Sequence, residues 1–145
     1  MTQETAIRAV ISGLSDELTA YQRLLNVLTE QHHLMSRHKT EELLVLNERE
    51  TQLLALLYQK AKQRSHHLRL LGYNPDEKGM ACFIQTLPNL LRQRTEDVWN
   101  KIYHQFRLCQ ALNSLNGRLL ASQRDTLNHL FHAEQQQDYS YLFQQ

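Results

Sequence analysis

The sequence predicts an all-α protein in which an antiparallel hairpin of two long helices packs with a third long helix. A short helix and a flexible C-terminal tail complete the predicted architecture. Leucine and glutamine favour helices, and they account for 27 and 16 of the 145 residues. The 4 glycines and 2 prolines are too few for the tight turns of a many-stranded sandwich or barrel. We therefore expect a coiled-coil-like bundle of few, long helices.

The first long helix is predicted to begin near Thr5 and to continue to Met35. From Leu14 onward, one set of positions recurs at alternating steps of four and three, which is the heptad spacing of a packed helix. The charged stretch from Ser36 to Lys39 interrupts this pattern and is short enough to fold the next helix back. The heptad positions are Leu14, Leu18, Tyr21, Leu25, Leu28, His32 and Met35.

The second long helix is predicted to begin at Thr40, as its N-cap, and to end at Gly72. Acidic residues follow Thr40 and basic residues gather near the end, an order that complements the helix dipole. Gly72 and the following Asn74–Pro75 pair are typical of a helix end. Its heptad positions are Leu43, Leu46, Glu50, Leu53, Leu57, Ala61, Arg64, Leu68 and Leu71.

A short apolar helix is predicted from Met80 to Leu87, where Pro88 ends it because proline lacks a backbone N–H. The last helix is predicted from Asn89 to Phe131. Its heptad positions are Val98, Ile102, Gln105, Cys109, Leu112, Asn116, Leu119, Gln123, Thr126 and Leu130. A second stripe of Trp99, Phe106, Leu108, Leu115, Leu120 and Leu127 widens the apolar face.

The heptad pattern continues in phase through Asn116 and Gly117, a pair that usually signals a turn. One unbroken helix is therefore expected, at a cost of about 1 kcal/mol for glycine relative to alanine. Residues 1–131 then form a single helical-bundle domain. Residues 132–145 are polar with a terminal aromatic cluster and form a flexible tail.

Three amides, those of Gln105, Asn116 and Gln123, interrupt the apolar line of the last helix. Buried amides in a coiled coil set the register of the helices. Alternatively, this part of the helix is an exposed amphipathic surface that awaits a partner helix. The spacing leaves both interpretations open. In the second, the apolar anchors are Leu119, Leu120, Leu127, Leu130 and Phe131.

No pattern in the chain indicates a catalytic, cofactor or metal site. The eight histidines lack an HExxH motif, and Cys82 and Cys109 form no CxxC pair, so free thiols and solvated histidines are expected. A net charge of +1 gives no reason to bind nucleic acid. No apolar stretch approaches the roughly 20 residues of a membrane span, and no secretory signal is visible. We expect a cytoplasmic binding protein that is not an enzyme.

Three motifs in this order resemble the FlgN-type flagellar export chaperones. They are LGYNPDEKGM at 71–80, TLPNLL at 86–91 and CQALNSLNGRLL at 109–120. The resemblance covers roughly residues 14–131. It implies a bacterial cytosolic chaperone without ATPase activity that binds the C-terminal helices of hook-associated (hook–filament junction) proteins. Such chaperones prevent premature assembly of these clients and deliver them to the flagellar type III export apparatus.

The resemblance also implies roles for particular residues. By position, the client-binding residues are Asn113, Asn116, Gly117, Leu119, Leu120, Leu127, Leu130 and Phe131. A tyrosine of the family's C-terminal segment contacts the export gate, and Tyr139 and Tyr141 are the candidates here, without the usual Tyr-x-x-Asp-Gly surroundings. The alternative function is a structural coiled-coil adaptor that oligomerises without delivering clients. Periodicity leaves monomer and homodimer both open.

Overall fold

The computed structural model describes residues 2–127, with side chains described as far as Leu119. This part of the chain contains four helices and no strand, which confirms the all-α class. The helices are α1 (Gln3–Ser36), α2 (Thr40–Leu70), α3 (Glu77–Gln85) and α4 (Asn89–Leu127). Each corresponds to one predicted helix, so both the element order and the three-long-helix architecture are confirmed.

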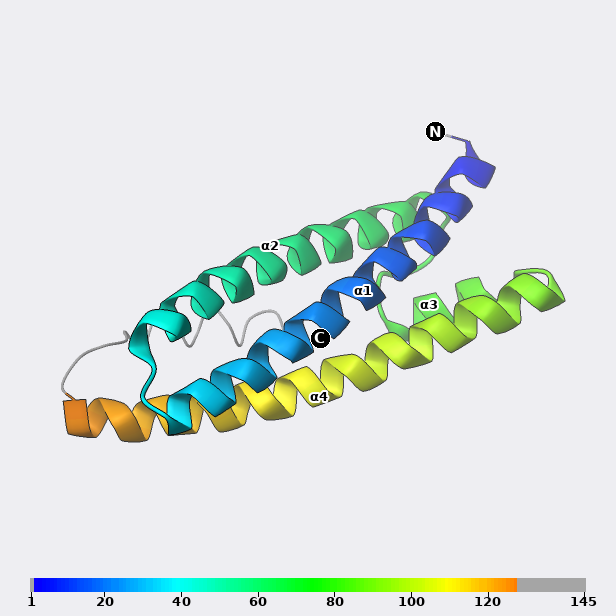
Figure 1. The fold of residues 1–145 in the computed structure, drawn as a ribbon. Helices are drawn as coiled ribbons and strands as arrows, with labels where there is room; N and C mark the ends of the chain where they lie inside the picture. The colour runs from blue at the N-terminus through cyan, green and yellow to red at the C-terminus, as the bar shows by residue number, and fades with distance from the viewer. Residues whose placement is uncertain (1, 128–145) are drawn as a thin grey trace.

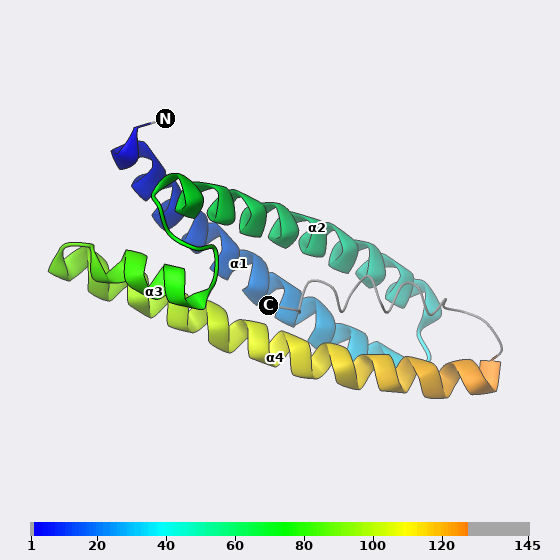
Figure 2. The same cartoon turned by 180° about the vertical axis from the view of Figure 1, so that it is seen from behind.

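Helix α1 lies in the middle of the bundle, with α2 on one side and α4 on the other (Figures 1 and 2). The three-residue connection after Ser36 makes α2 antiparallel to α1. Helix α4 runs in the same direction as α1, because the chain returns along α2 and reverses at the turn between α3 and α4. The short α3 lies beside the first half of α4. Both outer helices therefore pack chiefly on α1.

Two faces of α1 are buried, and the heptad pattern identified only one of them. The predicted face contacts α4: the rings of Tyr21 and Phe106 meet edge to face with centroids 6.3 Å apart. A second line of positions at seven-residue spacing faces α2. It consists of Val10, Glu17, Leu24 and Gln31, all buried. Polar residues at two of these four positions hid this face from a search for apolar periodicity.

The predicted helix ends need three corrections. Thr40 is the first helical residue, not the N-cap, and the cap position belongs to Lys39, which makes no side-chain capping bond. Helix α3 begins at Glu77, three residues early, because Oδ1 of Asp76 accepts a hydrogen bond from the Gly79 amide at 2.7 Å. It ends at Gln85, since the next residues turn into Pro88. Helix α4 continues through Asn116 and Gly117, as predicted.

The two glycines of the LGYNPDEKGM segment are each required by the local structure, for different steric reasons. Gly72 ends α2 with φ +86°, a left-handed conformation in which glycine carries no strain from a side chain. At Gly79, an added Cβ would lie 1.7 Å from the carbonyl oxygen of Asn74. The loop can fold tightly onto α3 only without that carbon. This packing places Met80 and Phe83 in the core, where both are about 1% exposed.

Candidate binding groove

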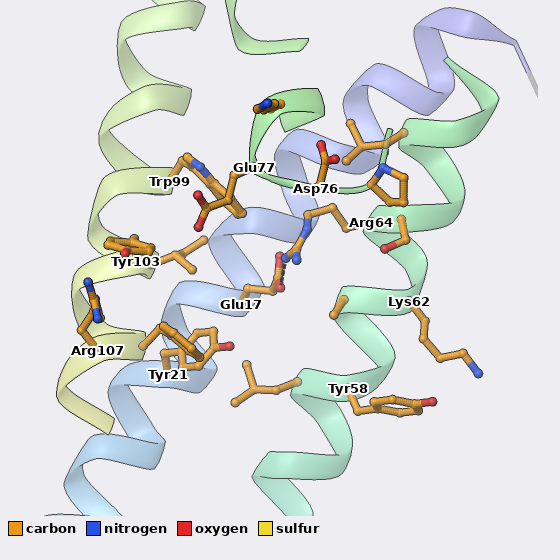
Figure 3. Close-up of a pocket in the computed structure, with 18 of the residues that line it drawn as sticks. Glu17, Tyr21, Tyr58, Lys62, Arg64, Asp76, Glu77, Trp99, Tyr103 and Arg107 are labelled. Carbon is orange, nitrogen blue, oxygen red and sulfur yellow. Dashed lines mark hydrogen bonds and ion pairs between the residues drawn. The ribbon is translucent and has the colours of Figure 1, made fainter. Parts of the chain in front are cut away.

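A groove runs between α2 and α4, above α1, because the two outer helices pack on α1 and not closely on each other (Figure 3). Its volume is about 1000 Å³. We call it the α2/α4 groove. It lies beside the last half of α2, the loop that follows α2, the start of α3 and the first half of α4. Its defining residues are Tyr21, Tyr58, Arg64, Trp99, Tyr103 and Phe106.

Aromatic rings and cations line the two walls of the groove. Tyr58 on α2 and Tyr103 on α4 are 39% and 45% exposed. The Nζ of Lys62 lies 5.2 Å from the Tyr58 ring centroid, and the guanidinium of Arg107 lies 5.3 Å from that of Tyr103. Rings of this size with a polar tip are enriched where proteins bind one another. The walls therefore have the composition of a recognition surface.

An ion pair in the floor of the groove connects the three long helices. Arg64 of α2 donates a hydrogen bond to the Glu17 carboxylate of α1, and its guanidinium lies 5.1 Å from the ring centroid of Trp99 on α4. The side chains of Glu17 and Arg64 are 3% and 13% exposed. Burial raises the pKa of Glu17, while the neighbouring Arg64 and Lys60 oppose that rise. The pair fixes the position of α2 relative to α4.

The α4 wall of the groove continues beyond the enclosed part toward the end of the helix. Trp99, Phe106, Gln110, Asn113 and Gly117 succeed one another at steps of seven, four, three and four, so they share one helix face. Asn113 and Gly117 are half-buried. A Cβ added to Gly117 would meet no atom within 4 Å. Open space therefore continues along this face, and nothing within the described chain requires glycine there.

Asn116 does not share this face but is buried between α4 and α1. Its Nδ2 donates to the Leu28 carbonyl oxygen at 2.9 Å, and its Oδ1 lies 3.1 Å from Nδ1 of His32. The amides of the last helix were expected either to set the helix register or to lie on an exposed surface for a partner helix. The first interpretation describes Asn116. Gln105 and Leu119 lie on the same side of α4 and are half-buried.

The other residues predicted to bind a client fall at the edge of the described chain. Leu120 and Leu127 belong to α4, but their side chains, like that of Gln123, are outside the description. Leu130, Phe131, Tyr139 and Tyr141 lie outside the described residues, as do the predicted domain boundary at residue 131 and the tail. Of the predicted residues, Asn113 and Gly117 share the helix face of the α4 wall, although neither lines the enclosed part of the groove.

A second polar cluster lies between α1 and α2 and shares no residue with the groove lining. The Nε2 of Gln31 donates to Oε1 of Glu50 at 2.7 Å and to Oδ1 of Asn47 at 3.0 Å. Burial raises the pKa of Glu50, an effect that the Gln31 hydrogen bond opposes. This cluster positions the α1–α2 hairpin and does not face solvent.

The cysteines and histidines that the structure describes form no catalytic or metal-binding arrangement. Burial and the nearby Glu50 raise the pKa of Cys109 to about 12, which disfavours the nucleophilic thiolate. Cys82 is exposed and unpaired with another cysteine. Within residues 2–127, no three His, Cys, Asp or Glu side chains gather closely enough to hold a metal ion. In the same range, no helix has the length and apolar character needed to cross a bilayer.

The groove itself was not predicted from the sequence, although two of its residues belong to a predicted apolar stripe of the last helix. Trp99 and Phe106 belong to the predicted second stripe, and both line the groove. Tyr58 and Tyr103 lie outside every predicted heptad position, so the periodicity did not mark them as groove residues. Leu108 and Leu115, also in the second stripe, are each 40% exposed on another part of α4. Aromatic residues next to Lys or Arg at i+4, as in Tyr58–Lys62 and Tyr103–Arg107, are the pattern that could have indicated the walls.

The fold and the groove define a bundle of three long helices with an open, aromatic-lined groove between the two outer helices. The sequence model of the FlgN protein family matches residues 1–141, and the chain belongs to that family.

Comparison with known proteins also shows this fold in a solved structure. The crystal structure of a Pseudomonas aeruginosa protein, described as a flagella synthesis protein FlgN, superposes with a TM-score of 0.73 at 17% sequence identity. The alignment covers 91% of this chain and 91% of that one. At this identity the match shows a shared fold. No curated protein sequence matches the chain.

Proposed function

We propose that the chain is a cytosolic chaperone of flagellar type III export. It binds the C-terminal helices of hook-associated proteins, prevents their premature assembly and delivers them to the export apparatus. Membership of the FlgN family supports a role in building the flagellum. The open groove between α2 and α4 supports the binding of a helix. Binding and release of this kind require no catalytic residue in the chaperone.

The observation that carries the proposal is the open groove and its continuation along α4. In a four-helix bundle, a fourth helix would cover α2 and α4 where they diverge above α1. An amphipathic client helix can take that place by setting its apolar face into the groove. The client would then complete the bundle. Asn113 and Gly117 lie where the groove opens toward the end of α4.

Gly117 allows a client backbone to approach α4 closely. Glycine within a helix costs about 1 kcal/mol relative to alanine, and no neighbour in the free chain requires it. In the proposed complex, the absent side chain gives the client room. Asn113 offers its amide at the same contact. Asn116 acts indirectly, since its bonds to α1 hold α4 in register.

The remaining predicted residues extend this contact along the chain. Leu119, Leu120, Leu127, Leu130 and Phe131 supply apolar surface beyond the groove. Tyr139 and Tyr141 contact the export gate. The chaperone itself acts as a monomer or as a homodimer, and the stoichiometry of the client complex distinguishes the two.

The test is a calorimetric titration of the full chain with the C-terminal helical segment of a hook-associated protein. Gly117→Leu places a side chain in the open space, and overpacking a contact costs about 1–3 kcal/mol, so binding should weaken by about fivefold to 150-fold. Ala111→Leu is the matched control, because residue 111 is exposed on another face of α4. It should bind like the parent.

A second variant tests the apolar extension. Leu127→Asp combined with Leu130→Asp should abolish client binding while circular dichroism shows the fold retained. Binding unchanged in both this variant and Gly117→Leu would place the site elsewhere. A parent chain that binds no client and forms a stable self-assembly would instead identify a structural coiled-coil adaptor.

A further inference from the structure

The α2/α4 groove carries an excess of positive charge beside its exposed rings. Four exposed cationic side chains line it, and two exposed anionic ones, Asp76 and Glu77, lie at one end (Figure 3). The cations are Lys62, Arg69, Lys78 and Arg107. Glu17 is buried and already paired with Arg64. An occupant that fits this surface supplies apolar or aromatic side chains together with carboxylates.

The segment 128–145 of the same chain has this complementary composition. It contains no Lys or Arg, and its acidic residues are Glu134 and Asp138. Tyr139, Tyr141, Leu142 and Phe143 form an aromatic and aliphatic cluster near its end, whereas Leu130 and Phe131 lie near its start. Acidic and aromatic groups therefore lie close together in the sequence, as the groove requires.

The length of this segment matches the distance to the groove. Leu127 follows Phe106 by 21 residues and Trp99 by 28, so the enclosed groove lies about 32–42 Å back along α4 at 1.5 Å per residue. An extended chain advances about 3.3 Å per residue, so Tyr139 can reach about 40 Å from Leu127 and Phe143 about 53 Å. The aromatic cluster can therefore arrive at the groove, whereas a much shorter segment could not.

We propose that residues 128–145 turn back along α4 and place the aromatic cluster of Tyr139, Tyr141 and Phe143 in the α2/α4 groove when no client is bound. The carboxylates of Glu134 and Asp138 then face the cationic walls. Attachment to α4 gives the segment an effective concentration on the order of millimolar, so weak individual contacts suffice. The contact between segment and groove is inferred from the groove and the sequence of the segment alone, and only its displacement by a client rests on the proposed function.

Trp99 provides a direct test, because it is the single tryptophan of the chain and lines the groove. Quenching of its fluorescence by acrylamide is measured in the full chain without client. Replacing Tyr139, Tyr141 and Phe143 together by Ser should uncover the groove and raise the quenching constant severalfold. The matched control replaces Gln135, Gln136 and Gln137 by Ser, and its quenching should equal that of the parent. All six positions lie outside the described residues 2–127, and circular dichroism of both variants checks that folding is unchanged.

Two further measurements separate the segment from other occupants. Because the contact is intramolecular, protection of Trp99 should not change on dilution. Protection lost on dilution would assign the groove to a second copy and overturn the proposal. Equal quenching of the aromatic variant and its control would also overturn it. If a client helix then protected Trp99, the groove would belong to the client, and the proposed function would survive the loss of this inference.

Discussion

The contacts of α1 and the walls of the α2/α4 groove distribute polar and aromatic residues in opposite ways. Along α1, Glu17 and Gln31 are buried, and each has a partner on α2. In the groove, Tyr58 and Tyr103 are exposed. Proteins more often expose carboxylates and amides and bury large rings. The reversal indicates that polar groups set the arrangement of the helices, while aromatic surface is left available.

The difference has a thermodynamic basis. A buried polar group without a partner costs about 1–3 kcal/mol, so the α1 contacts form only when their partners align. An exposed ring is stabilised when it is covered, and the covering group can come from elsewhere. The closed contacts therefore specify one packing of three helices. The open groove specifies what those helices can bind.

The largest effect is expected at the boundary between the two regions, at Arg64. Replacing Arg64 by Ala leaves the Glu17 charge buried without its partner and removes the group over Trp99. Breaking a buried ion pair from one side costs about 3–5 kcal/mol, and urea unfolding near neutral pH should show a loss of that size. A smaller loss would mean that water reaches Glu17 through the groove.

The control for this variant is Lys101→Ala. Lys101 pairs with Asp97, and their side chains are 60% and 63% exposed. Exposed pairs contribute about 0–1 kcal/mol. A cost for Lys101→Ala as large as that of Arg64→Ala would show a general sensitivity to the loss of charge pairs and would remove the distinction between closed and open regions.

A second prediction compares two neighbouring residues of α2. Leu57 is 3% exposed and Tyr58 is 39% exposed. Leu57→Ala should lower the free energy of unfolding by about 2–5 kcal/mol, as for a leucine in a packed core. Tyr58→Ala should cost less than Leu57→Ala, and the cost should fall to about 0.5 kcal/mol or less, as for a surface residue, once Ser at 139, 141 and 143 removes the rings proposed to cover the groove. Urea unfolding of the two variants measures the contrast.

The outcome at Tyr58 tests whether the groove is open. If Tyr58→Ala destabilises the chain as strongly as Leu57→Ala, the ring belongs to the core and something already covers it. The same comparison in a chain carrying the Ser substitutions at 139, 141 and 143 then shows whether that cover is the C-terminal segment.

The helices could be predicted because their signals are local. Heptad spacing, the glycine at position 72 and the proline at position 88 each act within a few residues, and the structure confirms the helices that they indicate. The predicted helix ends were less accurate than the predicted helices, because the position of a helix end depends on individual capping hydrogen bonds. The bond from the Gly79 amide to Asp76 starts α3 three residues before the apolar run.

The groove could not be predicted because it depends on which helices pack together. Periodicity shows that α1, α2 and α4 each have an apolar face that must be buried. It does not show which helix each face packs against, and so it could not predict that α2 and α4 both pack on α1. The α2-facing line of α1 contains Glu17 and Gln31, whose partners Arg64 and Glu50 lie 47 and 19 residues away. Asn116 was ambiguous for the same reason, since His32 and Leu28 are 84 and 88 residues distant.

The smallest predicted effect concerns pH and the closed α1–α2 contact. Burial raises the folded-state pKa of Glu50 above its ordinary value of 4.5. The folded chain then binds more protons than the unfolded chain between those two pKa values. The contribution of Glu50 to the free energy of unfolding is fully present below the unfolded-state pKa. It is lost as the pH rises through the folded-state pKa. Glu50→Gln removes the charge and keeps an oxygen that can accept from Gln31.

We therefore expect Glu50→Gln to be more stable than the parent near neutral pH, by less than the Arg64→Ala loss. The difference should shrink as the pH falls toward 4.5, and urea unfolding across this range measures it. Glu17 contributes equally to both chains and cancels. The exposed neighbour Glu48 provides the control, and Glu48→Gln should follow the pH profile of the parent. A difference that grew toward low pH would show that the carboxylate of Glu50 is stabilised by the fold, contrary to its burial.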